Sequence, residues 1–416
     1  LGSRREELIT SAAKKLQINQ MIDFHQGHYF VSRDIGRIAS NYYIKYSSIE
    51  TFNKLLKERM NEADIFSMIS ESSEFADLKS REEESKELSE LKNDYCYCQI
   101  KQTSDTTPGK VNILLQSYLS KAKIEDSALI SDSAYVAQNT ARIIRGLFEI
   151  ALYRNWNHVT SLLLEISKSI DKQMWTFRTP LIQFGLPDEI ITKIESHSNL
   201  TIEKMRDMKP PELGQLVHNN RYGSTIARIV DLFPSLKLDA CVYPITRTIL
   251  RVSLDITPDF SWSDRVHGTA EPWWIFVDDS ESEELYHSEY FLLSKKQHSE
   301  TQKLGFVIAV QEPLPSQIYI NAVSDRWIGA KYSFPVSTNN IVLPEYYQQH
   351  TELLPLPPIP VTDLKNKILE EICAKRFSHF NPVQTQVFNT LYNSSNNVLV
   401  GAPTGSGKTV IAELAM

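Results

Sequence analysis

The sequence predicts a multidomain protein in which helices come first, strands follow and an α/β unit begins near the C-terminus. Three observations predict this order. Apolar residues recur every three or four positions from Asp34 to about Trp175, the period changes to two at about Cys241, and a glycine-rich segment closes the chain. With 416 residues, the chain is long enough for two or three domains that each bury a core.

Composition limits the class of protein. A hydrophobic content of 42% and a charged content of 23% are ordinary for a soluble globular protein. No uninterrupted apolar run of about 18 residues occurs, and Leu1 to Glu7 contain neither a signal region nor an initiator Met. We therefore expect a fragment of an intracellular protein that contacts no membrane. The net charge of −7 implies that any nucleic-acid contact is local.

Residues 34–175 are predicted to form an all-helical bundle because long proline-free runs carry the helical period. The acidic run from Arg81 to Glu84 is expected to be a solvated helix face. In residues 176–240, frequent prolines predict shorter helices. The helices expected at 201–208 and 212–217 flank Pro210 and Pro211, which leaves two interpretations, a helix-hairpin-helix phosphate clamp or plain helical packing.

Residues 241–343 are predicted to form a β-sandwich. Thr248 to Ile256 alternate between apolar and polar, and further strands are expected at 273–277, 286–293, 304–310 and 317–323. Short strands at this spacing are typical of a sandwich. Four tryptophans are expected in its core: Trp262, Trp273, Trp274 and Trp327. The alternative is that Trp273 and Trp274 form a partner-binding surface.

Prolines between Pro344 and Pro360 predict a stiff linker over residues 344–376, and a new domain begins at 377. Near the C-terminus a β-branched run at 397–400 precedes a glycine-rich loop and an apolar helix start, the order that a phosphate-binding loop requires. The residues predicted to bind ATP here are Ala402, Pro403, Thr404, Gly405, Ser406, Gly407, Lys408 and Thr409.

The chemistry of this loop follows from its residue types. Glycines let successive backbone N–H groups turn inward as an anion nest, and the following helix adds its positive end. Lys408 would hold the β and γ phosphates, and the Thr409 hydroxyl would ligate Mg²⁺. Ala402 stands where the general pattern has its first glycine, which leaves Gly405, Gly407 and Lys408 in place.

Upstream, Gln384 is predicted to read adenine, because an amide presents both a donor and an acceptor. A glutamine about twenty residues before a phosphate loop resembles the adenine-recognition motif of superfamily 2 helicases. Phe380 has two interpretations at this stage, packing against the base or packing in the domain core.

Several further stretches carry a family resemblance: 36–44, 131–139, 325–327 and 350–354. They resemble the Sec-sixty-three homology unit joined to a second cassette, as in the tandem-cassette helicases of superfamily 2. The resemblance implies a winged-helix remnant (1–33), a helical bundle with a ratchet-like helix (34–175), a helix-hairpin-helix-like subdomain (176–240), an immunoglobulin-like β-sandwich (241–343), a proline-rich linker (344–376) and the start of a truncated RecA-like lobe (377–416).

The same resemblance implies a function and partners. It implies an ATP-dependent 3′-to-5′ helicase acting on single-stranded DNA or RNA in the nucleus and cytoplasm. The partners it implies are other subunits of a cointegrator complex and the ribosome, and the roles are DNA repair and ribosome quality control. The residues that complete hydrolysis are expected beyond Met416, so this chain alone would be inactive. A non-catalytic interaction platform is the alternative.

The stretch 131–156 matches the helix that lies across the translocating strand in such relatives. Its apolar stripe is Ala134, Ala137, Ala141, Ile144, Phe148 and Ala151. A second stripe contains Arg142 and Arg145, which are candidates for phosphate contact. The alternative for Arg145 is an ion pair with Glu149 four residues later.

Overall fold

The computed structural model describes residues 2–25, 29–197, 200–279, 284–345 and 351–416. The chain divides into two compact units, Leu1–Pro344 and Glu345–Met416. Of the resemblance motifs, His350 lies outside the described residues, as do parts of the predicted winged-helix, helix-hairpin-helix, sandwich and linker segments. None of the described helices combines the length and apolarity that crossing a membrane requires.

The first unit begins with helix α1 (Gly2–Ile18) and an antiparallel pair of strands, β1 (Ile22–His25) and β2 (Tyr29–Ser32). Helix α2 (Asp34–Asn41) follows directly. Gly36 is required near its start, because a Cβ at this position would lie 2.1 Å from the carbonyl oxygen of Met21. This close approach fixes α2 against the end of α1.

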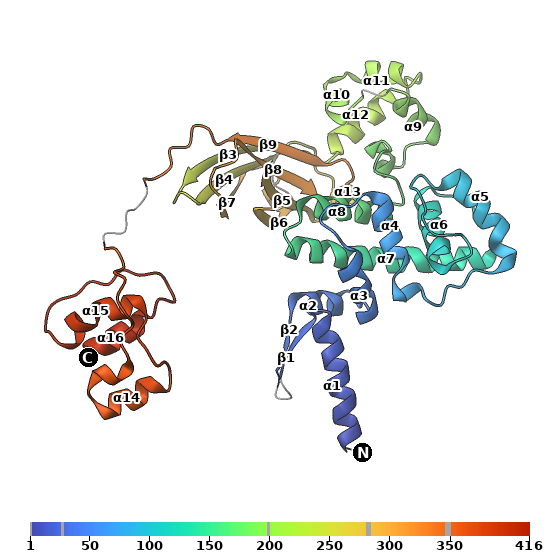
Figure 1. Cartoon of the computed structure of the whole chain (residues 1–416). Helices are drawn as coiled ribbons and strands as arrows, with labels where there is room; N and C mark the ends of the chain where they lie inside the picture. The colour runs from blue at the N-terminus through green and yellow to red at the C-terminus, as the bar shows by residue number, and fades with distance from the viewer. Residues whose placement is uncertain (1, 26–28, 198–199, 280–283, 346–350) are drawn as a thin grey trace. The chain divides into compact units, whose positions relative to one another are not determined.

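The bundle continues through α3 (Tyr46–Leu55), α4 (Glu62–Ser70), α5 (Ser85–Tyr95), α6 (Thr107–Leu119), α7 (Ser127–Tyr153) and α8 (Asn157–Lys172), with 3₁₀ turns η1 (Ser73–Phe75) and η2 (Glu82–Glu84). Helix α7 has 27 residues and lies beside α8 (Figure 1). Asp126 caps it by accepting hydrogen bonds from the N–H groups of Ala128 and Leu129 at 2.7 and 3.0 Å. Of the predicted apolar stripe, Ala134 is exposed and Ala141 half-buried, whereas the other four are buried.

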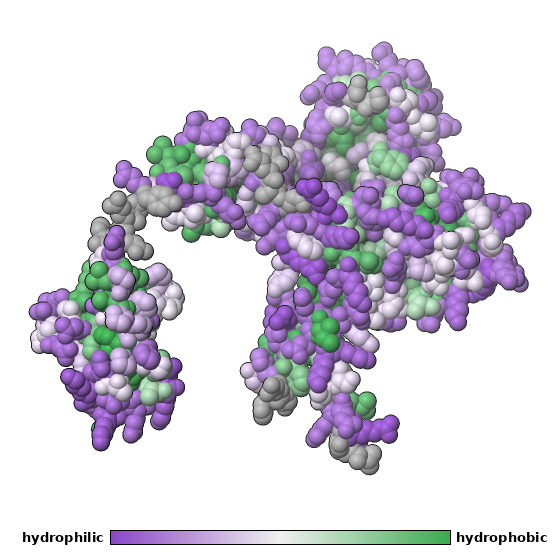
Figure 2. Space-filling model, in the orientation of Figure 1, coloured by the Kyte–Doolittle hydropathy of each residue, from purple (hydrophilic) through white to green (hydrophobic). Residues whose placement is uncertain are grey.

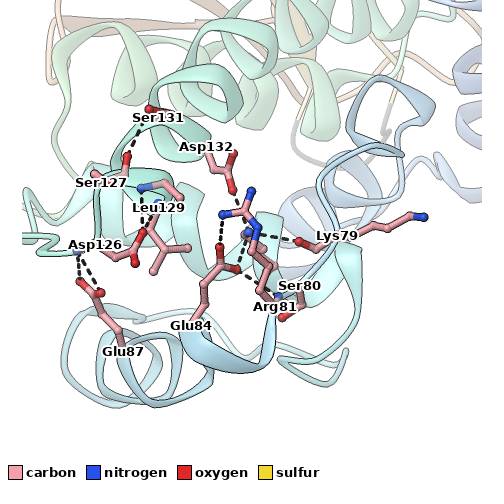
Figure 3. A network of polar contacts seen from close by, with 12 residues as sticks. Lys79, Ser80, Arg81, Glu84, Glu87, Asp126, Ser127, Leu129, Ser131 and Asp132 are labelled. Carbon is pink, nitrogen blue, oxygen red and sulfur yellow. Dashed lines mark hydrogen bonds and ion pairs between the residues drawn. The ribbon is translucent and has the colours of Figure 1, made fainter.

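In the acidic run, Arg81, Glu82 and Glu83 are exposed as predicted, but Glu84 is buried. Glu84 is 2% exposed and pairs with the buried Lys110 at 2.6 Å and with Arg81 at 2.9 Å. Lys110 also pairs with Asp132 of α7 at 2.7 Å, and Figure 3 shows Glu84, Arg81 and Asp132 gathered there. The burial of Glu84 was not predictable from the neighbouring sequence, because the lysine that neutralises Glu84 lies 26 residues away.

A second group of helices follows: η3 (Pro180–Phe184), α9 (Asp188–Glu195), α10 (Ile202–Asp207), α11 (Pro210–Leu216) and α12 (Gly223–Leu232). Pro210 and Pro211 lie at the start of α11, where proline is tolerated because the first helical turn makes no intrahelical hydrogen bond from its N–H groups. The two short helices expected on either side of these prolines are therefore present as α10 and α11.

Two antiparallel sheets complete this unit. Strands β3 (Leu236–Pro244), β4 (Ile249–Pro258) and β7 (Gln302–Ala309) form one, and β6 (His287–Ser294), β5 (Ala270–Asp279), β8 (Gln317–Ser324) and β9 (Lys331–Ser337) form the other. Short helices α13 (Asp264–His267) and η4 (Lys295–Gln297) lie in the connections. Strand β3 starts at Leu236, before the expected change of period, because Leu236, Leu238 and Ala240 already alternate with polar residues.

The two sheets share a hydrophobic core that includes Val252, Ile275 and Ile320. The opposite face of the four-stranded sheet contributes Phe276 and Val323 to the core of the helical bundle. In constant-type immunoglobulin domains the fourth strand joins the sheet of the first, second and fifth. Here the fourth strand, β6, pairs with β5 instead.

The tryptophans lie largely inside. Trp273 and Trp327 are 0% and 3% exposed, and Trp262 and Trp274 are partly buried. A partner-binding surface built on Trp273 and Trp274 is therefore wrong, because the first ring is enclosed between the sheets and the second packs against Phe148 of α7. Figure 2 shows a surface that is mainly hydrophilic with smaller apolar patches.

The second unit contains η5 (Val361–Leu364), α14 (Lys367–Ala374), α15 (Pro382–Tyr392) and α16 (Lys408–Ala415). Its small core is Val361, Leu364, Phe380, Phe388, Val410 and Leu414. Residues 397–400, expected as a strand, are not one in the described part of this unit, and Leu399 is 99% exposed. A strand needs a hydrogen-bonded neighbour, and residues 351–416 contain no other strand to pair with it.

Candidate functional site

The phosphate loop ends at helix α16, which begins at Lys408 as the motif predicts. Gly405 and Gly407 have φ values of 89° and 81°, in the left-handed region that glycine adopts without strain. Gly407 is the residue before the helix, so its conformation turns the loop into the first helical turn. The sequence therefore places the glycines where this backbone needs them.

Lys408 lies across its own loop. Its Nζ donates hydrogen bonds to the carbonyl oxygens of Ala402 at 2.6 Å and Pro403 at 2.9 Å. The Ser406 hydroxyl also donates to the Pro403 carbonyl, at 2.7 Å. Lys408 and Thr409 are exposed at the start of α16, so an arriving phosphate group can reach both side chains.

Gln384 lies against the phosphate loop. Its Nε2 donates to the carbonyl of Gly407 at 3.3 Å, and its Oε1 accepts from the N–H of Asn381 at 2.9 Å. The side chain is buried, and it forms a capping box with Asn381 at the start of α15. The structure thus brings Gln384 to the loop through protein contacts, and adenine recognition by this residue stays a prediction.

Phe380 is a core residue. It is 1% exposed, and its ring packs against Phe377 and Phe388 with centroid separations of 5.3 and 5.2 Å. Of the two interpretations left open, packing in the domain core is therefore the one that the structure supports. Stacking of Phe380 on a base is wrong, because the ring has no free face.

The sequence reasoning missed two contributors to this site. Asn381 donates from Nδ2 to the carbonyl of Ser406 at 3.0 Å. Arg376 donates from one nitrogen, Nη1, to both carboxylate oxygens of Glu413 in α16, at 3.1 and 2.8 Å. The signal for Asn381 was available, because asparagine before proline with glutamine three residues later is a helix-start signature.

The two arginines of α7 have structural partners. Arg142 donates to the carbonyls of Tyr42, at 2.8 Å, and Tyr43, where α2 has just ended. A cation at a helix C-terminus satisfies the unpaired carbonyls and the dipole. The geometry therefore gives Arg142 a structural role at this helix end, and its phosphate contact stays a prediction.

Arg145 reaches the sandwich. Its Nη1 lies 2.6 Å from Asp325 Oδ1, which also accepts a hydrogen bond from Trp274 Nε1 at 2.9 Å. The expected ion pair of Arg145 with Glu149 is wrong, since Glu149 accepts a hydrogen bond from the Tyr42 hydroxyl. Asp325 belongs to one of the resemblance motifs, and this contact explains its position.

Trp327 of the same motif is buried beside this junction, whereas Arg326 is exposed. Trp327 Nε1 donates to both oxygens of Glu271, at 3.2 and 3.1 Å, and the ring stacks on Phe184 at 5.0 Å. Burial raises the pKa of Glu271 to about 7, although the hydrogen bond from Trp327 opposes the rise. This turn joins the sheets to both groups of helices.

Comparison with known proteins agrees with this arrangement. The family model described as Sec63 Brl domain matches residues 32–337, and the model described as DEAD/DEAH box helicase matches residues 381–416. Activating signal cointegrator 1 complex subunit 3 of Rattus norvegicus is 51% identical over the whole chain, which covers 19% of that relative.

Two further relatives also match the whole chain. The U5 small nuclear ribonucleoprotein 200 kDa helicase of Homo sapiens is 44% identical, with 20% of its length covered. The RQC trigger complex helicase SLH1 of Saccharomyces cerevisiae is 43% identical, with 21% covered. The chain therefore spans about a fifth of the length of these relatives. It belongs to the Sec63 Brl domain family, and its C-terminal end matches the start of a DEAD/DEAH box helicase domain.

Proposed function

We propose that this chain is the junction between two cassettes of an ATP-dependent 3′-to-5′ nucleic-acid helicase. The observation that carries the proposal is the phosphate loop, in which two left-handed glycines lead into a helix that begins with Lys408 and Thr409. An exposed ammonium and an exposed hydroxyl at a helix N-terminus are the groups that bind the phosphates and Mg²⁺ of a nucleoside triphosphate.

ATP and Mg²⁺ fit the donors present. Lys408 would exchange its two carbonyl partners for the β and γ phosphates, because an ammonium binds phosphate more strongly than neutral carbonyls. The Thr409 hydroxyl suits Mg²⁺, which takes oxygen ligands and keeps several waters and phosphate oxygens. Gln384 would read adenine. In this proposal the acidic pair and the arginines needed for hydrolysis come from the rest of the helicase domain.

We assign the parent protein to the helicase subunit of the activating signal cointegrator complex. The relative with that name is 51% identical, against 44% for the U5 200 kDa helicase, which is the alternative. The partners we propose are the other subunits of that complex, single-stranded DNA or RNA, and the ribosome. This assignment implies that the parent protein acts in the nucleus and the cytoplasm. It also implies roles in DNA repair and in ribosome quality control.

The finer architecture is part of the same proposal. Residues 1–33 would be a winged-helix remnant, supported by α1 and the β1–β2 pair. Helices α10 and α11 would form the helix-hairpin-helix-like element, and the two sheets an immunoglobulin-like sandwich with β6 exchanged between sheets. Helix α7 would be the ratchet-like helix, and residues 377–416 the opening of a RecA-like lobe.

The test is a strand-dependent ATPase assay on the complete second cassette. Lys408→Ala should abolish the hydrolysis that single-stranded nucleic acid stimulates, because the phosphates lose their ammonium. Lys375→Ala, which removes an exposed lysine of the same unit, is the matched control and should leave the rate unchanged. Absence of hydrolysis in the wild-type cassette would instead make this chain part of a non-catalytic interaction platform.

A further inference from the structure

Tyr43 has an unusual combination of backbone conformation and exposure. Its φ is 52°, in the left-handed region, and its side chain is 82% exposed. No other tyrosine in the described part of the chain is as exposed. The ring therefore projects into solvent from a backbone conformation that costs free energy for any residue except glycine.

Tyrosine is an unusual residue type for this left-handed backbone conformation. The other non-glycine residues with positive φ among those described are polar: Gln20, Lys121, Asn155, Gln173, His218 and Lys365. Position 43 follows the end of α2, where glycine or asparagine is the usual choice. A tyrosine there gains nothing from packing, because its ring is outside the core.

Helix α7 holds the turn that carries Tyr43. Arg142 donates to the carbonyls of Tyr42 and Tyr43, and Glu149 accepts from the Tyr42 hydroxyl at 2.5 Å. Between them, Gly146 allows close approach, since a Cβ there would lie 2.5 Å from Ile44 Cδ1. These three positions of α7 recur at spacings of four and three, so they form one stripe.

The turn is also closed from within. The N–H of Tyr43 donates to the carbonyl of Ser40 at 3.2 Å, and the N–H of Ile44 donates to Ala39 at 2.8 Å. These two hydrogen bonds are those of a Schellman-type helix end, and together with the contacts from α7 they hold the left-handed conformation in spite of its cost for a tyrosine. The contacts fix the backbone and leave the ring free to meet something else.

The surroundings indicate what the ring would contact. Lys45 follows two residues later with an exposed side chain, and its Nζ donates to the neutral carbonyl of Ser73 at 3.3 Å. Arg37 of α2 is exposed but is paired with Asp34 at 3.2 Å, and Glu149 of α7 is engaged with Tyr42. In a chain of net charge −7, an exposed aromatic ring followed two residues later by an exposed lysine suits a strand that offers both bases and phosphates.

We propose that Tyr43 stacks on a base of a single-stranded nucleic acid, with Lys45 at a flanking phosphate. This inference rests on the proposed helicase function and adds a contact outside α7. Stacking tolerates any base, so Tyr43 would grip the strand without reading sequence. Helix α7 would act as its support through Arg142, Gly146 and Glu149.

The test measures binding of fluorescein-labelled oligo(U) and oligo(dT) by the chain, at one fixed salt concentration. Tyr43→Gly removes the ring and relieves the backbone strain, so affinity should fall about tenfold or more while the melting temperature does not fall. Tyr43→Phe keeps the ring and should bind within about twofold of wild type. Tyr243→Ala, which removes a 56% exposed tyrosine from the sandwich, is the matched control.

The outcomes separate the two proposals. Wild-type affinity in Tyr43→Gly would overturn the stacking contact and leave the helicase function standing, and loss of a co-purifying protein in that variant would indicate a protein-docking role instead. Failure of the wild-type chain to bind either oligonucleotide would overturn the stacking contact, whereas the helicase function is decided by the ATPase assay on the complete cassette. Photo-crosslinking with 4-thiouridine RNA gives a positional readout, with Tyr43 in the crosslinked peptide as the expected result.

Discussion

Asn381 and Ser406 join the two halves of the candidate nucleotide site, with the Asn381 amide Nδ2 donating to the Ser406 carbonyl at 3.0 Å. The same side chain accepts from the N–H of Gln384 at 2.9 Å and so caps α15. One asparagine thus starts a helix and fixes the phosphate loop 25 residues later. The carbonyl of Ser406 is thereby held toward α15, which fixes the backbone that would present N–H groups to phosphate.

Asn381→Asp separates these two roles. The carboxylate still accepts from the Gln384 N–H and caps α15, but it cannot donate to Ser406 and repels its carbonyl. We expect the KM for ATP of the complete cassette to rise about fivefold, as loss of one hydrogen bond of about 1 kcal/mol predicts. Asn366→Asp is the control, because Asn366 caps α14 through Ile368 and Leu369 alone. An unchanged KM in Asn381→Asp would show that the bond does not position the loop.

Gly407→Ala should inactivate nucleotide binding. A Cβ there would lie 2.3 Å from Gln384 Nε2, and the φ of 81° would add backbone strain. We expect binding of a fluorescent ATP analogue to weaken at least tenfold, since misplacement of about 1 Å costs far more than one contact. Gly401→Ala is the matched control, because nothing lies within 4 Å of its Cβ position. Equal effects of the two substitutions would contradict this geometry.

The sequence predicted what local pattern determines and missed what distant contacts determine. The phosphate loop and its helix start were predictable because every residue needed lies within one short segment. Glu84 was misjudged because Lys110 is far along the chain, and the predicted strand at 397–400 is absent because strand formation depends on a neighbour. Phe380 could not be placed, since an aromatic residue suits both a core and a base.

Helix α7 shows the same limit. Periodicity placed Arg142 and Arg145 on one stripe of α7, which is correct, but periodicity carries no information about what lies opposite. Arg142 meets the end of α2, and Arg145 meets Asp325, which is 180 residues away. Side chains that look available in a helix pattern can therefore be fully engaged in the fold.

The ion pair of Arg145 with Asp325 should contribute to stability. Both side chains are about four-fifths buried, at 22% and 19% exposed. A double-mutant cycle with Arg145→Ala and Asp325→Ala, followed by urea unfolding, should give a coupling free energy of about 1–3 kcal/mol. The exposed pair of Lys54 with Glu50 is the control, expected at about 0.5 kcal/mol or less. Equal coupling in both pairs would contradict a stabilising junction.

Lys110 should be intolerant of single substitution. Its side chain is 0% exposed between Glu84 and Asp132, so Lys110→Met removes the buried cation that both carboxylates share and leaves Glu84 with Arg81 alone. We expect the free energy of unfolding to fall by about 3–5 kcal/mol. Adding Glu84→Gln to Lys110→Met should recover part of this loss, because one buried charge is removed. A double variant less stable than Lys110→Met would show that charge is not the cause.

Stability should depend on pH through Glu271. Burial raises the pKa of this carboxyl from 4.5 to about 7, so between these values the folded chain binds more protons than the unfolded chain. The free energy of unfolding should therefore decrease as the pH rises from about 4.5 to 7, by on the order of 3 kcal/mol from this group. Glu271→Gln still accepts from Trp327 and should remove this slope, whereas Glu203→Gln, an exposed carboxyl, should retain it. Parallel pH profiles for wild type and Glu271→Gln would place the proton on another group.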